Sequence, residues 1–454
     1  MAAVASPPAR APQRSLRGGA VRWRDLALGA AGLGLTFAAP AHRVDLLLIG
    51  LAALVGGVIW SPMAGPVLIG AALPFFFFGR PLAGPLAFTP PGLALVATWL
   101  AIIPRAKKLQ LSWPKTAYDA PLALFLVASL LALSVSEYPL LSAREMRALI
   151  FEPVLFFWLL HTLRGSAPWA LGGFLAGASV TALAAVAQGP LGLGGTPAEG
   201  VLRAQAWYPS ANHLALMLGR AWPFLVAAAV ARWPLAWLPA ALVGLAIVLT
   251  FSTGGWLGAL AATLAVVVAL CRRRMAASFG AAAAVVLLVV SGLAIGGVLP
   301  ERLNPLRQTG GFRLDLWLSS LEMVRDHPLL GIGPDNFAYL YQQVYLRVGA
   351  AAEPNLSHPH NWLLHFWLEL GLLGLVAFLW LLVRFARQLR ATKRSWLAAG
   401  AAGAMVDLLV HGAIDNSYFL VDLAFVFWLC PALVGAPHAG EDAEINADVR
   451  IVGK

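Results

Sequence analysis

Residues 361 to 383 read NWLLHFWLELGLLGLVAFLWLLV, an apolar stretch whose only ionisable side chains are His365 and Glu369. A lipid hydrocarbon core about 30 Å thick is crossed by about 20 helical residues, and backbone groups inside it are satisfied only in helices or closed barrels. The stretch is rich in leucine and lacks the alternation of a barrel strand. It therefore predicts a membrane helix.

The same pattern recurs along almost the whole chain of 454 residues, which is 60% hydrophobic and only 12% charged. Soluble domains carry about 25% charged residues, so this chain cannot cover a water-facing surface. The predicted fold is all-α, a polytopic transmembrane helical bundle of about 12–14 membrane helices. The predicted segments are 26–40, 44–60, 64–79, 92–104, 119–135, 146–162, 168–188, 212–230, 235–251, 255–270, 280–298, 361–383, 396–413 and 417–435.

The distribution of charge predicts the orientation of this bundle. The net charge is +11, and the basic residues gather in short loops such as RAKK (105–108) and CRRR (271–274), as the positive-inside rule expects of cytoplasmic loops. Residues 1–24 are basic, Pro-rich and too polar for a signal peptide, so they predict a disordered cytoplasmic tail. Alternation from that tail also places a second tail, 437–454, in the cytoplasm. We expect membrane lipids as partners and no nucleic acid.

One connection on the opposite side of the membrane is unusually long. Residues 299–360 separate a helical region, 25–298, from the C-terminal helices in 361–436, whereas ordinary connections have about 4–6 residues. Apolar residues repeat there at helical spacing on one face: Leu314, Trp317, Leu318, Leu321 and Val324. This pattern predicts an amphipathic helix at the membrane surface, ended by the Pro and Gly residues of DHPLLGIGPDNF.

The connections on this side also gather polar and titratable residues. Alternation places them at or near one membrane surface, although they come from separate parts of the chain: Arg203, Asn212, Arg313, His358, His360, Asn361 and Asp415. Convergent polar groups between helices are typical of a ligand site.

His360 is the first catalytic candidate, because imidazole exchanges a proton near neutral pH and a general base contributes about 10²–10⁴-fold. A histidine at a helix mouth can also have a purely structural role. Arg313 and Arg203 are candidates for binding phosphate, since guanidinium binds it through paired donors and stays charged. Contacts with lipid headgroups are the alternative for both arginines.

Two further acids have more than one interpretation. The segment HGAIDNSYFLVD (411–422) places Asp415 in a tight turn, where Asp, Asn and Ser commonly cap helices. The other interpretation is that Asp415 orients His360. Glu369 is a functional candidate because it is ionisable inside a membrane helix, but it is also four residues from His365 and can pair with it.

The sequence predicts no metal ion and no cofactor. It contains no HExxH, no close pair of carboxylates in an outer loop and no cysteine cluster, since Cys271 and Cys430 stand far apart. A P-loop is absent as well, which argues against ATP as an energy source.

Three stretches carry a resemblance to a known family: GGFRLDLWLSSLEMVRDHPLLGIGPDNF (310–337), HPHNWLLHFWLELGLLGL (358–375) and HGAIDNSYFLVDLAFVFWL (411–429). Together with the weaker LRAQAWYPSANHLALM (202–217), they resemble the O-antigen ligase and polymerase family of integral membrane glycosyltransferases. The resemblance extends over most of the chain between the first and last of these stretches. The part before it matches only in hydropathy.

This resemblance implies a GT-C-like bundle in the bacterial cytoplasmic (inner) membrane. It implies a glycan donor linked to undecaprenyl diphosphate, a glycan or lipid-glycan acceptor, and metal-independent, inverting transfer on the periplasmic or exterior face. By motif, His360 would be the essential histidine, and Arg313 and Arg203 would bind the diphosphate. The chain departs from the family at Thr253, where members often have an arginine, and at Ala211, where proline is common.

On this interpretation His360 deprotonates or orients an acceptor hydroxyl, while Arg313 offsets charge on the leaving diphosphate. His358, Asn361 and Glu369 would support the base. A polymerase that joins lipid-linked repeat units would use the same residues. A transporter of lipid-linked glycans would instead show internal repeats and broken helices with charged residues near the midplane. A structural membrane protein is the remaining alternative.

Overall fold

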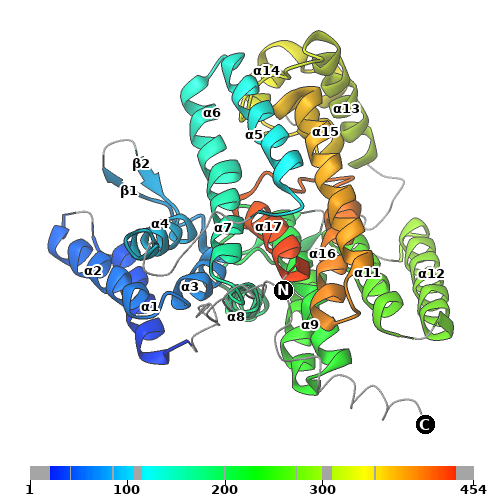
Figure 1. The fold of residues 1–454 in the computed structure, drawn as a ribbon. Coiled ribbons are helices and arrows are strands. Elements are labelled where there is room, and N and C mark those ends of the chain that lie inside the picture. The colour runs from blue at the N-terminus through cyan, green and yellow to red at the C-terminus, as the bar shows by residue number, and fades with distance from the viewer. Residues whose placement is uncertain are drawn as a thin grey trace, which may run out of the picture.

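The computed structural model describes residues 21–40, 42–83, 86–106, 115–198, 200–271, 273–298, 309–351 and 354–435. Residues 1–20 of the predicted N-terminal tail and the whole of the predicted tail 437–454 lie outside this part. Figure 1 shows a helical bundle with two small hairpins, which confirms the all-α fold class.

The first half of the chain forms helices joined by short connections. In chain order the elements are α1 (Trp23–Ala38), α2 (Val44–Trp60), α3 (Ala64–Ala72), β1 (Arg80–Ala83), β2 (Leu86–Phe88), α4 (Pro90–Ile102), α5 (Asp119–Ser134), α6 (Pro139–Met146), α7 (Glu152–Thr162) and α8 (Ala167–Gln188). The antiparallel hairpin of β1 and β2 was not predicted from the sequence.

The second half begins with another short antiparallel hairpin. Its elements are β3 (Thr196–Ala198), β4 (Val201–Arg203), α9 (Ala211–Ala231), α10 (Trp237–Leu249), α11 (Thr253–Leu270), α12 (Arg273–Ile295), α13 (Thr309–Asp326), α14 (Phe337–Leu340), α15 (Trp362–Ala391), α16 (Trp396–His411) and α17 (Val421–Gly435).

Most predicted membrane segments match a helix closely; α2, for example, has the predicted bounds. The segment 146–162 is an exception, because the helix already begins at Pro139 and continues through a π-helical turn, Arg147–Phe151, into α7. Pro153 has no backbone N–H to give to an ordinary helical bond, and such a gap favours a wider turn.

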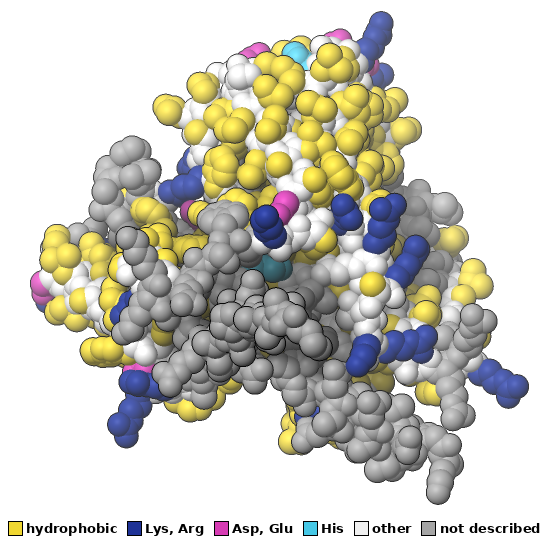
Figure 2. Space-filling model, in the orientation of Figure 1, with side chains coloured by type: hydrophobic (Ala, Val, Ile, Leu, Met, Phe, Trp, Pro, Cys, Tyr) yellow, Lys and Arg dark blue, Asp and Glu magenta, His cyan; other side chains and the backbone are white. Residues whose placement is uncertain are grey.

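Four described helices, α8, α9, α11 and α15, are at least 18 residues long and apolar enough to cross a membrane. Shorter apolar helices of 10–17 residues accompany them, including α2, α5, α16 and α17. The protein is therefore a polytopic membrane protein. Figure 2 shows apolar side chains over the upper part of the visible face, around α5, α6 and α15, with most of the Lys and Arg side chains below them.

The most enclosed helices are α9, α16 and α17, whose side chains are largely buried among their neighbours. Close approach between α9, α11 and α16 depends on glycine, since a Cβ at Gly258 would collide with Asp407 and one at Gly254 with His411. Asp407 forms a fully buried ion pair with Arg220. These contacts bring one end of α9, α11 and α16 together.

The predicted amphipathic helix in the long loop is present as α13. Of the predicted apolar face, Leu314, Leu318 and Leu321 are 58%, 37% and 51% exposed, as expected for a face in contact with lipid. Val324 is an exception, because it is 7% exposed and packs against the protein. The other side packs on the protein through Leu316 and Met323. In Figure 1, α13 and α14 lie together beside α15.

The helix α15 is broken at Gly371, where φ is 69°. The segment DHPLLGIGPDNF fills the break: Ile332 N donates to Leu368 O at 2.7 Å, and Leu372 N donates to Leu329 O at 3.0 Å. A side chain at Gly371 would collide with the Leu329 carbonyl oxygen, so glycine is required there by both space and conformation.

Candidate active site

Three helix N-termini and one C-terminus meet at one end of the bundle. At α9 and α11, a Cβ added to Gly255 would press on Ala215, so the first turns of the two helices are neighbours. The N-terminus of α15 joins them because Trp362 N donates to Gly412 O, just after the end of α16, at 2.8 Å. The predicted site residues are therefore on the same side of the bundle.

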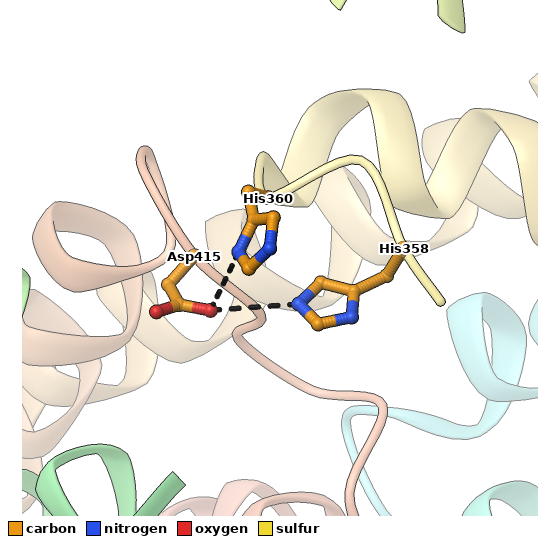
Figure 3. Close-up of side chains that lie close together, drawn as sticks. All are labelled: His358, His360 and Asp415. Atoms are coloured by element: carbon orange, nitrogen blue, oxygen red, sulfur yellow. Dashed lines mark hydrogen bonds and ion pairs between the residues drawn. The ribbon is translucent and has the colours of Figure 1, made fainter. Parts of the chain in front are cut away.

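At this junction two histidines share one carboxylate (Figure 3). His360 Nδ1 lies 3.0 Å from Asp415 Oδ1, and His358 Nε2 lies 3.5 Å from the same oxygen. Asp415 is 2% exposed. Its Oδ1 also accepts a hydrogen bond from Asn416 N at 2.8 Å, so Asp415 both caps its own turn and contacts His360.

Asn361 fixes the position of His360 relative to this turn. Its Oδ1 caps α15 by accepting from Leu363 N and Leu364 N, and its Nδ2 donates to Ala413 O at 3.1 Å. A single side chain thus joins the start of α15 to the turn that carries Asp415. The sequence analysis proposed Asn361 as a substrate ligand. Among the described residues, the hydrogen bonds of its side chain are with backbone groups.

The backbone is strained around the site. Among the described residues, non-glycine residues with positive φ are Ala206 (50°), Phe251 (49°), Asp335 (61°) and His360 (49°). Three of them lie in the connections that lead into α9, α11 and α15, and the fourth, Asp335, contacts Glu369. Such conformations cost about 1–3 kcal/mol each and collect at functional sites.

The electrostatics set different protonation states for the two partners of His360. Burial alone would raise the pKa of Asp415, but the neighbouring His360 and His358 outweigh it and hold that pKa well below its ordinary value. Burial, followed by repulsion from His360, lowers the pKa of His358 to about 4. Near neutral pH, Asp415 is therefore a carboxylate and His358 is neutral.

This arrangement leaves His360 suited to act as a base. When the ring is neutral, Nδ1–H donates to Asp415 and the lone pair lies on Nε2, the tautomer of a general base oriented by an acid. The His360 side chain is 17% exposed, while that of Asp415 is only 3% exposed. The base is thus the member of the pair that a substrate can reach.

Arg203 and Asn212 are brought together by the structure. Arg203 donates through Nε to Thr250 O at 2.7 Å and through a terminal nitrogen to Asn212 Oδ1 at 2.6 Å. The next residue, His213, has its ring centroid 6.4 Å from that of His358, which links this pair to the histidines. Arg203 therefore lies beside the site, between the start of α9 and the start of α11.

Arg313 approaches the site from α13. One turn further along this helix, Trp317 Nε1 donates to Pro359 O at 3.0 Å, which holds α13 against the segment between the two histidines. Arg313 also lies within electrostatic reach of His411, at the end of α16. The two arginines proposed for phosphate binding thus come to the junction from different elements.

Glu369 lies further inside the protein than the proposed base. Its Oε2 accepts a hydrogen bond from Asp335 N at 2.7 Å, and its Oε1 lies 3.6 Å from His365 Nε2. This confirms the predicted proximity of His365 and Glu369. Glu369 also lines a cavity together with His358, so it adjoins the site. Its polar contacts described above are with Asp335 and His365 rather than with His360.

The ligand atoms of His358, His360 and Asp415 all lie within 4.8 Å of one another, a spacing that could also hold a metal ion. Sequence spacing did not indicate this set, because the first two residues stand 55 or more positions from the third. The Asp415 oxygen already accepts bonds from His360 and Asn416. The geometry accommodates either a hydrogen-bonded base or a cation.

Several polar residues at the site were missed by the sequence predictions, among them His213, Glu145 and Asp335. His213 could have been found, since it adjoins Asn212 at the start of a predicted helix. Glu145 and Asp335 reach the site only because the loop before α14 folds back onto α5 and α6, where Asn336 Nδ2 donates to Ser136 Oγ and Ser142 Oγ. No pattern in the sequence around these residues predicts that contact.

Comparison with known proteins finds a family that part of this chain matches. The family model described as O-antigen ligase matches residues 238–379, from α10 into α15. This confirms the resemblance over that stretch, which contains Arg313, His358, His360, Asn361 and Glu369. Arg203, Asn212 and Asp415 lie outside the matched range.

A curated protein of Rickettsia felis, named "Putative polysaccharide ligase", is 25% identical to this chain over 126 residues. The alignment covers 27% of this chain and 31% of the relative. The chain therefore matches about a third of the length of that relative.

Proposed function

We propose that this protein is a glycan ligase that transfers a glycan from a lipid diphosphate to an acceptor hydroxyl. The reaction would occur on the outer face of the bacterial cytoplasmic membrane, with undecaprenyl diphosphate as the lipid carrier. The observation that carries the proposal is the contact of His360 with buried Asp415 at 3.0 Å, at the mouth of an apolar helix within the matched family segment.

The chemistry would be a single displacement with inversion. The acceptor oxygen attacks the anomeric carbon of the donor sugar as His360 Nε2 takes the hydroxyl proton. The bond from that carbon to the diphosphate oxygen breaks, and the lipid diphosphate leaves with the electron pair. Asp415 stabilises the imidazolium that forms, as an acid does in other base-orienting pairs.

The leaving diphosphate would be bound where positive charge gathers at the junction. Arg203 and Arg313 supply guanidinium groups, and the first turns of α9, α11 and α15 present backbone N–H groups there. Thr253 stands in the first turn of α11, where the family often has arginine. In place of that arginine, the diphosphate would be bound by backbone N–H groups and by Arg203, which contacts the end of α10. In this proposal, neither the binding of the diphosphate nor the proton transfer to His360 requires a metal ion.

The polymerase alternative uses the same chemistry with another lipid-linked glycan as acceptor. Both comparisons name ligases, which favours ligation. Transport gains less support, although α15 is broken and Arg220 is buried. The break is closed by hydrogen bonds from residues 329–332, and the charge of Arg220 is neutralised by Asp407, so neither feature forms a substrate path.

The test is transfer of a lipid-linked glycan by purified protein in liposomes. His360→Ala and Arg313→Ala are each expected to lower the transfer rate by about 10²-fold or more. His327→Ala and Arg325→Ala make the same changes at exposed positions close to α13's end and should leave the rate unchanged. Transfer at wild-type rates in both test variants would rule out the mechanism.

A further inference from the structure

A cavity of about 160 Å³ lies on the inner side of His358. Its polar lining comes from separate parts of the chain: Glu145, His213, Asp335, Ser357, His358, His365, Glu369 and Asn416. Phe419 supplies an apolar wall beside them. The centroids of the His358 and His360 rings are 4.2 Å apart. A molecule in the cavity would therefore be separated from the proposed base only by the ring of His358.

One lining group lacks a partner. His365 is 3% exposed, and its Nδ1 has no hydrogen-bond partner among the described residues. Its ring is held between those of His358 and Phe419, with centroids 5.6 Å and 4.0 Å away. A buried polar atom without a partner destabilises the protein, so a ligand hydroxyl that bonds to it in the cavity would be favoured.

The chemistry of the lining selects the kind of ligand. The lining contains carboxyl and imidazole groups and no lysine or arginine, so a phosphate or carboxylate entering it would lose its hydration with no cation on the lining to pair with it. Hydroxyl groups suit it, because each can donate to a carboxylate and accept from an imidazole N–H. The volume equals the share of about five water molecules, which is enough for a sugar ring and too little for a glycan chain.

We propose that this cavity binds the terminal sugar of the acceptor, and that this sugar is uncharged. The assignment rests on the function proposed above. The arginines that would hold the donor diphosphate do not line the cavity, which leaves it for the other substrate. An acceptor sugar in the cavity, in contact with Glu369 and His365, would extend its reacting hydroxyl past His358 to His360. The protein would thereby reject acceptors that end in phosphorylated or acidic sugars.

The experiment is saturation-transfer NMR on the purified full chain in lipid nanodiscs, with single sugars as probes. Methyl glucoside and methyl N-acetylglucosaminide should receive saturation, whereas glucose 6-phosphate and methyl glucuronide should not. Leu420→Trp, which places an indole in the cavity, should lower the neutral signals by about tenfold or more. Leu379→Trp adds the same ring at a 40% exposed position and should change nothing.

A second variant guards against misfolding of the first. Leu420→Arg places a cation on the cavity lining, so it should raise the glucose 6-phosphate signal, a gain that a misfolded protein would not show. Equal signals from neutral and anionic sugars in the wild type, or neutral signals that survive Leu420→Trp, would overturn the assignment.

The two proposals can fail separately. His360→Ala should lose glycan transfer and keep methyl glucoside binding, since His360 does not line the cavity. If binding behaves as expected but transfer does not depend on His360, the catalytic mechanism fails and the sugar site stands. If transfer depends on His360 but the sugars do not bind, the sugar site fails alone.

Discussion

His360 and Asp415 are 55 positions apart in sequence, yet His360 Nδ1 lies 3.0 Å from Asp415 Oδ1. The contact joins the segment just before α15 to the turn between α16 and α17. The carboxylate of Asp415 is buried, whereas the imidazole of His360 is partly exposed and can be reached by a substrate. The contribution of each residue can be tested separately.

Replacing Asp415 by Asn is expected to lower glycan transfer by about 10²- to 10⁴-fold, because an amide can stabilise the wrong ring tautomer and does not neutralise the imidazolium. The measurement is the initial rate of transfer in liposomes. The double variant His360→Ala, Asp415→Asn should be no slower than His360→Ala alone, since the two residues act as a unit. Additive losses would show that Asp415 acts independently of His360.

Chelation is expected to leave transfer unchanged, because the proposed reaction uses a hydrogen-bonded base. Added zinc should inhibit reversibly, since His358, His360 and Asp415 present ligand atoms within 4.8 Å of one another. The measurement is the transfer rate after EDTA treatment, with and without excess zinc. Loss of activity in EDTA that returns with a divalent cation would instead make the triad a metal site.

Stability should fall as pH drops from about 6.5 to about 4, the pKa to which burial and His360 lower His358. In this window the unfolded chain carries a proton on this ring and the folded chain does not, so the folded state loses up to about 3 kcal/mol. The lowered pKa of Asp415 adds a further loss at lower pH, below its ordinary value of about 4.

The measurement for this prediction is the thermal denaturation midpoint as a function of pH in detergent. His358→Gln removes the titrating ring while keeping a polar side chain, so its midpoint should depend less on pH between these values. Equal slopes for the variant and the wild type would show that His358 is not the group responsible.

Gly371→Ala should destabilise the protein by more than about 1 kcal/mol, because the residue has φ of 69° and faces the Leu329 carbonyl closely. The comparison is Gly172→Ala in α8, where a Cβ would have nothing within 4 Å and alanine favours the helix. Denaturation midpoints in detergent distinguish the two. A similar midpoint for both variants would mean that the loop does not hold the break in α15.

Arg220→Met should destabilise the bundle by about 3–5 kcal/mol, because it leaves Asp407 charged and buried without its partner. Arg220 also donates to Ser417 O at 3.0 Å, two residues after Asp415, so transfer should fall as well. The double variant Arg220→Met, Asp407→Leu should recover much of the stability. If it is as unstable as the single variant, packing rather than charge is responsible.

The sequence by itself determined the helices. The length and apolarity of a run such as 361–383 are local properties, and they suffice to favour a helix in the hydrocarbon core of a membrane. It also identified His358, His360 and Asp415 as candidates, because titratable residues at helix ends are rare in so apolar a chain. It also predicted that Glu369 and His365 are close together, which the structure confirms. The hydrogen bond from Asn361 Nδ2 to Ala413 O and the one that Glu369 accepts from Asp335 N were not predicted.

Only the tertiary structure decided which candidates meet. Whether Asp415 caps its turn or contacts His360 was open in the sequence, and the fold shows that one oxygen does both. The cavity behind His358 was not predicted from the sequence, since its lining comes from α6, α9, α15 and three loops. Hydropathy follows from neighbouring residues in the chain, whereas hydrogen bonds and cavities follow from helix packing, which joins residues without regard to their separation in sequence.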